Sequence, residues 1–161
     1  MGRKILVVAV VVGLVGAGGF SRAGDSETVK EVKQAILEGN AFALENNKGR
    51  PGEYSRHGAL EFWSSGGLMQ EQLPEAGLGS WDSFNIDIKH IEVIELVPGQ
   101  AAVAMYYSEG SMHPKGAAPV PHYFTRVTQV FVKEDGEWKI RASHWSPVSG
   151  GSGTSQTAVE E

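Results

Sequence analysis

The apolar residues change their spacing partway along the chain, and this change constrains the fold more than any other feature. Over residues 25–46 apolar side chains recur at helical spacing, with Val29, Val32 and Ile36 on one face. From Phe84 onward the spacing becomes that of strands separated by turn residues. A helical segment followed by a series of strands predicts an α+β fold, in which N-terminal helices pack on a strongly curved antiparallel sheet.

Four strands are predicted in the second half of the chain, over residues 86–96, 101–110, 122–133 and 137–146. The first has a mixed alternation of apolar and polar residues, so we expect it to contain a bulge. Residues 97–100 and 134–136 predict tight hairpin turns, and the prolines and glycine of residues 111–121 predict a loop.

The segment between the helix and these strands has weaker signals. Residues 51–56 predict a short second helix, because proline is well suited to a first helical position. Residues 59–63 favour a strand. Residues 68–81 contain a proline and two glycines, so we expect irregular chain with a helical turn near Trp81.

The chain opens with a pattern typical of a secretory signal peptide. Arg3 and Lys4 precede an apolar run over residues 5–20, and Ser21 and Ala23 place small residues at positions −3 and −1 of a cleavage site. The run is shorter than the roughly 20 apolar residues of a membrane span. We therefore expect export to the periplasm or the medium, with no membrane attachment after cleavage; an uncleaved anchor is the alternative.

The charge and composition of the mature chain narrow its partners. Removal of residues 1–23 takes away three of the 14 basic residues and leaves all 19 acidic ones, for a net charge of −8. This charge argues against nucleic acid and anionic membranes as partners. The chain has no cysteine, so packing alone must stabilise it. Residues 149–161 are rich in Gly, Ser and Thr and predict a disordered tail, which leaves residues 25–148 as one domain.

The end of this domain resembles a known family. Residues 126–146 read RVTQVFVKEDGEWKIRASHWS, which is a strand, an acidic-Gly turn, a Trp-x-Ile strand and a His-x-Ser ending. With the preceding helix and strand order, this pattern resembles the SnoaL-like branch of the NTF2-like superfamily over residues 25–148. The resemblance implies a cone-shaped α+β domain with a pocket between sheet and helices, frequently dimeric through the sheet. It implies no single function, because the superfamily includes ketosteroid isomerases, polyketide cyclases, dehydratases, binders and scaffold domains.

The register of the last hairpin decides which of its residues face the core. A three-residue loop with Gly136 in the left-handed conformation would place Arg126 opposite His144. Both would then share the apolar face that carries Trp138 and Ile140. A polar end on an otherwise apolar buried face is what the floor of a ligand pocket needs.

A two-residue Asp-Gly turn would shift this register. It would instead bring Val127 and Phe131 to the inner face, together with Gln129 and Lys133. We favour the three-residue loop, because it buries no lysine.

The favoured register predicts a site in the cone. His144 would act as general acid or base, and Arg126 would hold a carboxylate or an enolate-like oxygen. The alternative is a structural role, in which both side chains bond to neighbouring backbone or to Glu61 or Glu109. The complete set of predicted ligand contacts is Trp63, Tyr107, Arg126, His144 and Ser146.

Other chemistries have less support in the sequence. The five histidines show no metal-ligand spacing, so we expect no metal and no cofactor. Asp82 and Asp87 supply carboxylates of the kind that ketosteroid isomerases use, but neither lies in a matching motif. Of the four tryptophans, Trp63 is the best pocket candidate, and we expect the other three in the core or a dimer interface.

These observations lead to three functional alternatives. The leading one is an exported domain that binds a small, mostly apolar molecule, without established catalysis. The second is an acid–base enzyme of the isomerase, cyclase or dehydratase type that uses His144 and Arg126. The third is an association domain without a ligand, a homodimer formed through an outer sheet face that includes Phe131 and Trp145.

The predicted signal peptide has a direct test. Cleavage after Ala23 gives a mature chain that begins at Gly24, because the small residues then stand at −3 and −1. N-terminal sequencing of secreted material should show this start. Recovery of the chain in a membrane fraction with Met1 retained would contradict the prediction.

Overall fold

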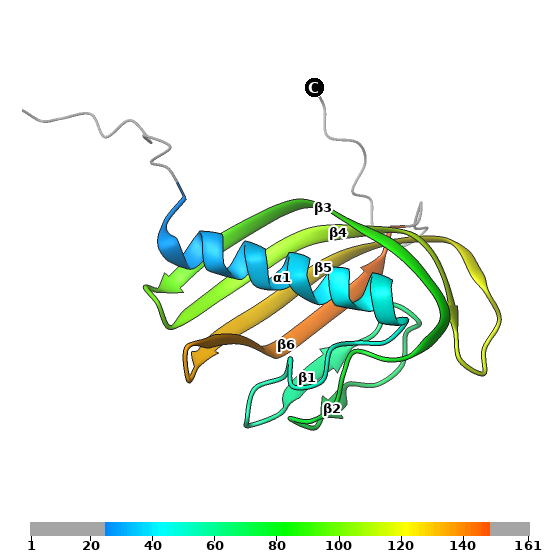
Figure 1. Ribbon diagram of the computed structural model, residues 1–161, viewed down its shortest axis with the longest axis horizontal. Helices are drawn as coiled ribbons and strands as arrows, with labels where there is room; N and C mark the ends of the chain where they lie inside the picture. Colours follow the sequence, from blue (N-terminus) through cyan, green and yellow to red (C-terminus); the bar gives the residue numbers. More distant parts are fainter. Residues whose placement is uncertain (1–24, 149–161) are drawn as a thin grey trace, which may run out of the picture.

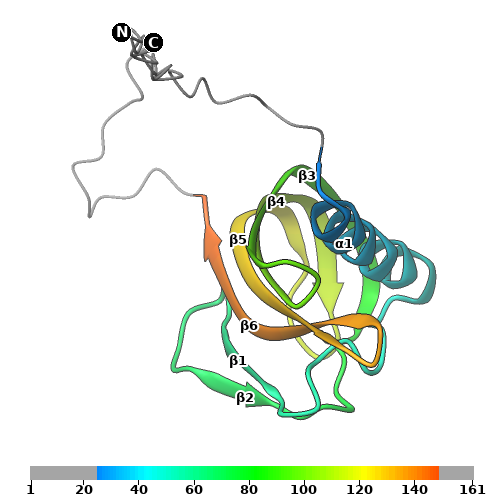
Figure 2. The same cartoon turned by 90° about the vertical axis from the view of Figure 1, so that its left-hand side faces the viewer.

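The computed structural model describes residues 25–148; the predicted signal peptide and the predicted C-terminal tail lie outside the described residues. One helix, α1 (Glu27–Asn46), precedes six strands (Figure 1). The strands are β1 (Ala59–Phe62), β2 (Gln70–Gln72), β3 (Trp81–Val97), β4 (Ala101–Pro114), β5 (Val120–Glu134) and β6 (Glu137–Pro147). They form a sheet of order β2-β1-β6-β5-β4-β3 that curves around α1 (Figure 2).

The predicted α+β class is confirmed, with one correction to the sheet. All neighbouring strands are antiparallel except β1 and β6, which run parallel, so the sheet is mixed. The expectation of an antiparallel sheet fails at this one pair: β1 pairs antiparallel with its sequence neighbour β2 on one side and parallel with the last strand, β6, on the other. At the other edge, β3 is displaced in register against β4 between Lys89 and Glu92, which confirms the predicted bulge.

Helix α1 is the predicted amphipathic helix. The Ser26 side chain caps its start by accepting a hydrogen bond from the backbone N–H of Val29, and Asn47 ends it in the left-handed conformation. Its buried face carries Thr28, Val32, Ile36 and Ala43. No helix within residues 25–148 is long and apolar enough to cross a membrane.

The second predicted helix, over residues 51–56, is absent, and that prediction was wrong. This segment instead runs beside β6, where Ser55 N–H donates to the Ile140 carbonyl and Ile140 N–H donates to the Glu53 carbonyl. The predicted loop over residues 111–121 is also shorter than expected. Both flanking strands extend into it, and Met112 still pairs with Val120 across a bulge. Prolines are tolerated there because they stand near strand ends.

The β5–β6 hairpin adopts the register that was not favoured. Asp135 and Gly136 both have positive φ, at 51° and 85°, so the turn has two residues and Glu134 pairs with Glu137. Such a turn matches the twist of the flanking strands. The expected cost of burying Lys133 had disfavoured this register. The structure removes that cost, because Lys133 Nζ lies 2.7 Å from a carboxylate oxygen of Glu31 on α1.

The two-residue turn moves Arg126 to the other side of the sheet, and the one-residue shift in pairing between Val130 and Phe131 moves His144 there as well. Arg126 pairs with Ser146, and His144 pairs with Thr128. Val127, which alternates with these positions along β5, is buried at 2 % exposure. Arg126 and His144 are both exposed on the outer face. The predicted pairing of Arg126 with His144 on the inner face was therefore wrong.

Candidate functional site

A cavity of about 450 Å³ lies between α1 and the inner face of the sheet, and its walls are mostly apolar. Helix α1 contributes small and apolar residues such as Ala35, Ile36 and Ala43. The opposite wall comes from the inner faces of strands β3 to β6, with residues such as Ile88, Phe131 and Ile140. This volume lies within the range of small-molecule sites.

All four tryptophans of the chain, Trp63, Trp81, Trp138 and Trp145, line this cavity. The sequence favoured only the first of them as a wall residue, so the placement of the other three differs from expectation. Trp145 is on the inner face because the pairing of β5 with β6 shifts by one residue between Val130 and Phe131, so that Trp145 pairs with the inner residue Val127. Trp81 reaches the cavity because β3 begins at that residue, and its ring lies 4.4 Å from the ring of Phe84.

One carboxylic acid, Glu53, stands among the described residues of the cavity wall. It is 7 % exposed, and its Oε2 atom has no hydrogen-bond partner. Its Oε1 atom lies 3.4 Å from Nε of Arg50, which also lines the cavity. Burial raises the pKa of Glu53 to about 7, although the positive charge of Arg50 opposes the shift. A carboxyl group in this state can give or accept a proton near neutral pH.

The helix leaves room for this carboxyl group at Gly39. A Cβ atom placed on Gly39 would lie 2.5 Å from Oε1 of Glu53. Glycine in the middle of a helix costs about 1 kcal/mol relative to alanine. The glycine that interrupts an otherwise regular amphipathic helix therefore has a structural reason, which is the close approach of Glu53.

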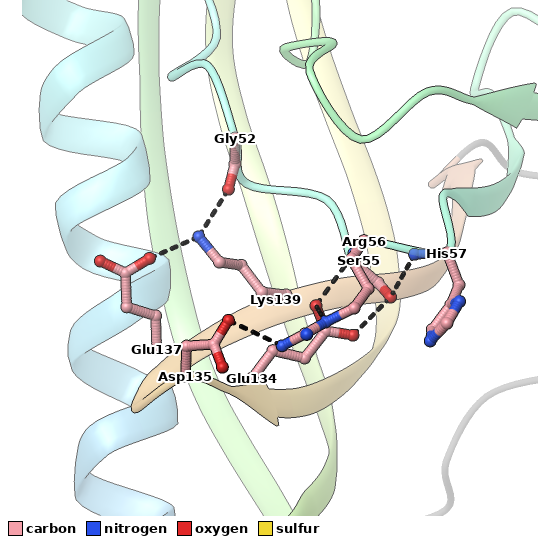
Figure 3. A network of polar contacts seen from close by, with 8 residues as sticks. All are labelled: Gly52, Ser55, Arg56, His57, Glu134, Asp135, Glu137 and Lys139. Carbon is pink, nitrogen blue, oxygen red and sulfur yellow. Dashed lines mark hydrogen bonds and ion pairs between the residues drawn. The ribbon is translucent and has the colours of Figure 1, made fainter.

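The segment that carries Glu53 is held against the β5–β6 hairpin by a polar cluster (Figure 3). Glu134 accepts hydrogen bonds from the Ser55 hydroxyl at 2.7 Å and from the Arg56 backbone N–H at 2.9 Å. The Arg56 guanidinium also pairs with Asp135 in the turn. Lys139 donates to the carbonyl of Gly52 at 2.7 Å. These contacts on both sides of Glu53 fix its backbone relative to β6.

A series of buried, hydrogen-bonded polar side chains runs along the cavity wall opposite the helix. The Tyr106 hydroxyl donates to Oε1 of Gln129 at 2.7 Å, and Nε2 of Gln129 donates to the Ser143 hydroxyl at 3.2 Å. Both Tyr106 and Gln129 line the cavity. Farther from it, the Tyr54 hydroxyl donates to Glu61, which is fully buried. Burial raises the pKa of Glu61, and the hydroxyls of Ser143 and Tyr54 oppose this shift.

The structure brings only one of the predicted ligand contacts into the cavity. Trp63 lines it, whereas Tyr107, Arg126, His144 and Ser146 do not. Tyr107 pairs with Arg126 on the outer face, and the ring of His144 lies 5.6 Å from that of Phe62. The predicted site is therefore not assembled as a cavity floor, because the two-residue turn and the register shift between Val130 and Phe131 place Arg126, His144 and Ser146 outside.

Glu53 was not among the site residues predicted from the sequence. The segment had been assigned to a second helix, where an acidic residue near the start is ordinary. The signal that could have pointed to it is Gly39, an exception in a strong helix. Among residues 25–148, no group of three or more His, Asp or Glu side chains is arranged to hold a metal ion.

The geometry defines an α+β protein whose curved sheet and single described helix enclose an apolar cavity. No family model and no curated protein matches the chain. A ketosteroid isomerase-like protein from Erwinia carotovora atroseptica SCRI1043 is 16% identical, with a TM-score of 0.56, over 78% of this chain and 99% of that one. An NTF2-like protein of unknown function from Pseudomonas putida KT2440 is 16% identical, with a TM-score of 0.54, over 74% and 85%.

A third solved structure, from Xanthomonas campestris, is named for a calcium/calmodulin-dependent protein kinase II association domain. It is 18% identical to this chain, with a TM-score of 0.54, over 78% of this chain and 91% of its own. At these identities the likeness concerns the fold alone. The fold is the NTF2-like fold, as the sequence resemblance implied.

The raised pKa of Glu53 predicts a pH-dependent stability. Because the folded state holds the proton more tightly than the unfolded state, stability falls as the pH rises from about 4.5 to about 7. Glu53→Gln removes this loss, so its free energy of unfolding should exceed that of the wild type by up to roughly 3 kcal/mol above neutral pH. The two should converge in acid.

Urea denaturation at one acidic and one alkaline pH would measure this difference. Glu92→Gln, which removes an exposed acid from β3, is the matched control and should show no such pH dependence. A Glu53→Gln variant that is less stable than the wild type at alkaline pH would mean that the ionised carboxylate is favourably paired with Arg50.

Proposed function

We propose that this protein binds a small, mostly apolar molecule in the cavity between α1 and the sheet. The observation that carries the proposal is the cavity itself, about 450 Å³ and lined mainly by apolar and aromatic side chains. Ligand sites of this kind combine apolar walls with a few placed polar groups. Here the polar groups include Arg50, Glu53, Tyr106 and Gln129.

We further propose that the binding takes place outside the cytoplasm. The support is the N-terminal pattern of basic, apolar and small residues over positions 3–23. The absence of cysteine is compatible with this location, because the fold then needs no disulfide to form there. The predicted acid–base role of His144 and Arg126 finds no support in their positions, since both lie outside the cavity. We therefore propose binding without catalysis.

Filling the cavity from the helix should abolish binding. Ala43 lines the cavity, whereas Ala41 on the same helix is exposed, so Ala43→Phe and Ala41→Phe form a matched pair. Binding of an apolar fluorescent naphthylamine probe, followed by its emission, should be lost in Ala43→Phe and kept in Ala41→Phe. The free volume accommodates the added ring, so Ala43→Phe should remain folded by circular dichroism. Equal probe binding by both variants would contradict the proposal.

A second candidate function, self-association through the sheet, is favoured by the outer face. Apolar side chains with large exposure cover it; they include Leu60, Phe62, Ile94, Met105, Tyr107 and Phe124. Soluble monomers rarely expose large contiguous apolar patches, so these side chains make the outer face a candidate interface. The outer residues are not those expected from the sequence, because Phe131 and Trp145 both line the cavity. The structural neighbour named for an association domain gives this candidate further support.

The homodimer has its own test. Met105 stands on β4, where its neighbours Ala104 and Tyr106 are buried and its own side chain is 51% exposed. Met105→Glu places charges of like sign near each other across a symmetric interface, so light scattering should show a shift from dimer to monomer. Leu37→Glu, on the exposed side of α1, should stay dimeric. A wild-type monomer at tens of micromolar would contradict this second candidate.

A further inference from the structure

The cavity is unusually rich in aromatic side chains. Eight of the 28 residues that line it are aromatic, whereas 9% of the whole chain is aromatic. Tryptophans supply half of these eight rings. The faces of Trp, Tyr and Phe rings carry negative partial charge and attract cations, which is how aromatic cages hold ammonium groups.

The single carboxyl group of the wall is incompletely neutralised. The titratable groups that interact with Glu53 through their charge include Arg50 and Tyr54 from its own segment, Lys139 from β6, Glu61 from β1 and Tyr106 from β4. Both cations are shared with other acids. Arg50 also lies 3.9 Å from Glu38, and Lys139 lies 2.6 Å from Glu137. One oxygen of Glu53 has no hydrogen-bond partner.

The net charge of the domain, like the carboxyl group of Glu53, attracts cations. Residues 25–148 contain 17 acidic and 11 basic residues, a net charge of −6. A net negative field raises the local concentration of cations and speeds their association. It disfavours an anionic ligand, which would also meet a buried carboxyl group in the wall, where the one cation among the described lining residues, Arg50, is already shared between Glu53 and Glu38.

We propose that the ligand is an apolar amine or ammonium compound, whose cationic head lies beside Glu53 and whose apolar body fills the aromatic cavity. This inference rests on the proposed binding function and names its ligand class. The head supplies the charge that Glu53 lacks, and burial in the cavity removes both groups from water, which strengthens their attraction. The surrounding rings add their attraction for the same cation.

Three ligands that share one skeleton test this inference: 4-phenylbutylamine, 4-phenyl-1-butanol and 4-phenylbutyrate, which are cationic, neutral and anionic at about pH 8. Isothermal titration calorimetry of residues 24–161 should give the tightest binding for the amine, by about tenfold or more over the alcohol. Quenching of tryptophan fluorescence gives a second readout, because all four tryptophans line the cavity.

The variants Glu53→Gln and Glu92→Gln each remove one negative charge, the first inside the cavity and the second on the exposed side of β3. Glu53→Gln should bind the alcohol as the wild type does and lose the preference for the amine. Glu92→Gln should keep that preference. The alcohol series also shows whether Glu53→Gln retains an intact cavity.

The outcomes separate this inference from the function on which it rests. If the alcohol binds as tightly as the amine, or the butyrate binds most tightly, the cavity binds ligands but the inference of a cationic ligand is overturned. A preference for the amine that persists in Glu53→Gln also overturns it. If none of the three binds, and the naphthylamine probe does not bind either, the proposed function itself has failed.

Discussion

The pairing between Glu31 and the β5–β6 hairpin is the interaction on which the rest of the structure depends. Glu31 accepts hydrogen bonds from Lys133 Nζ and, at 2.8 Å, from Nε1 of Trp138. The same ammonium group lies 5.5 Å from the centre of the Trp138 ring. These contacts join the helix to the tip of the hairpin. They also neutralise the lysine that the two-residue turn brings to the inner face, and so permit the register that the structure adopts.

That register decides what each face of the sheet can do, because neighbouring residues of a strand point to opposite sides. With Glu134 opposite Glu137, the inner face receives Val127, Gln129 and Phe131. A slip of one residue would exchange this set for Arg126, Thr128, Val130 and Val132. The cavity and the outer apolar face are therefore two results of one choice. A change that weakens the Glu31 pairing should disturb both together.

Much of the fold could be predicted from the sequence, because its signals are local. The amphipathic period of α1 and the bulge of β3 depend on residues close together in the chain. The parallel pairing of β1 with β6 joins segments some eighty positions apart, and no local pattern specifies it. The prediction of the β5–β6 hairpin register was wrong for a similar reason. The cost of burying Lys133 was judged from the hairpin alone, whereas its partner Glu31 stands about a hundred residues earlier.

Less of the candidate site than of the fold could be predicted from the sequence. Trp63 was predicted as the best pocket candidate among the four tryptophans, and it does line the cavity. Glu53 was missed because its segment was assigned to a helix. Its burial is a tertiary property that depends on Gly39 of α1 and on the polar cluster around Glu134.

Stability alone does not explain why the carboxyl group of Glu53 is buried. A glutamine or an apolar residue in place of Glu53 would avoid the cost of burying a charge above neutral pH. Gly39 adds a second cost by weakening the helix that covers the same cavity. These two unfavourable features meet at one point, because a Cβ atom on Gly39 would lie 2.5 Å from Oε1 of Glu53. Their coincidence indicates that the position of the carboxyl group serves something other than folding. Most of the remaining wall is apolar and aromatic, and we propose that the carboxyl group serves the recognition of one polar group on a ligand whose other surface is apolar.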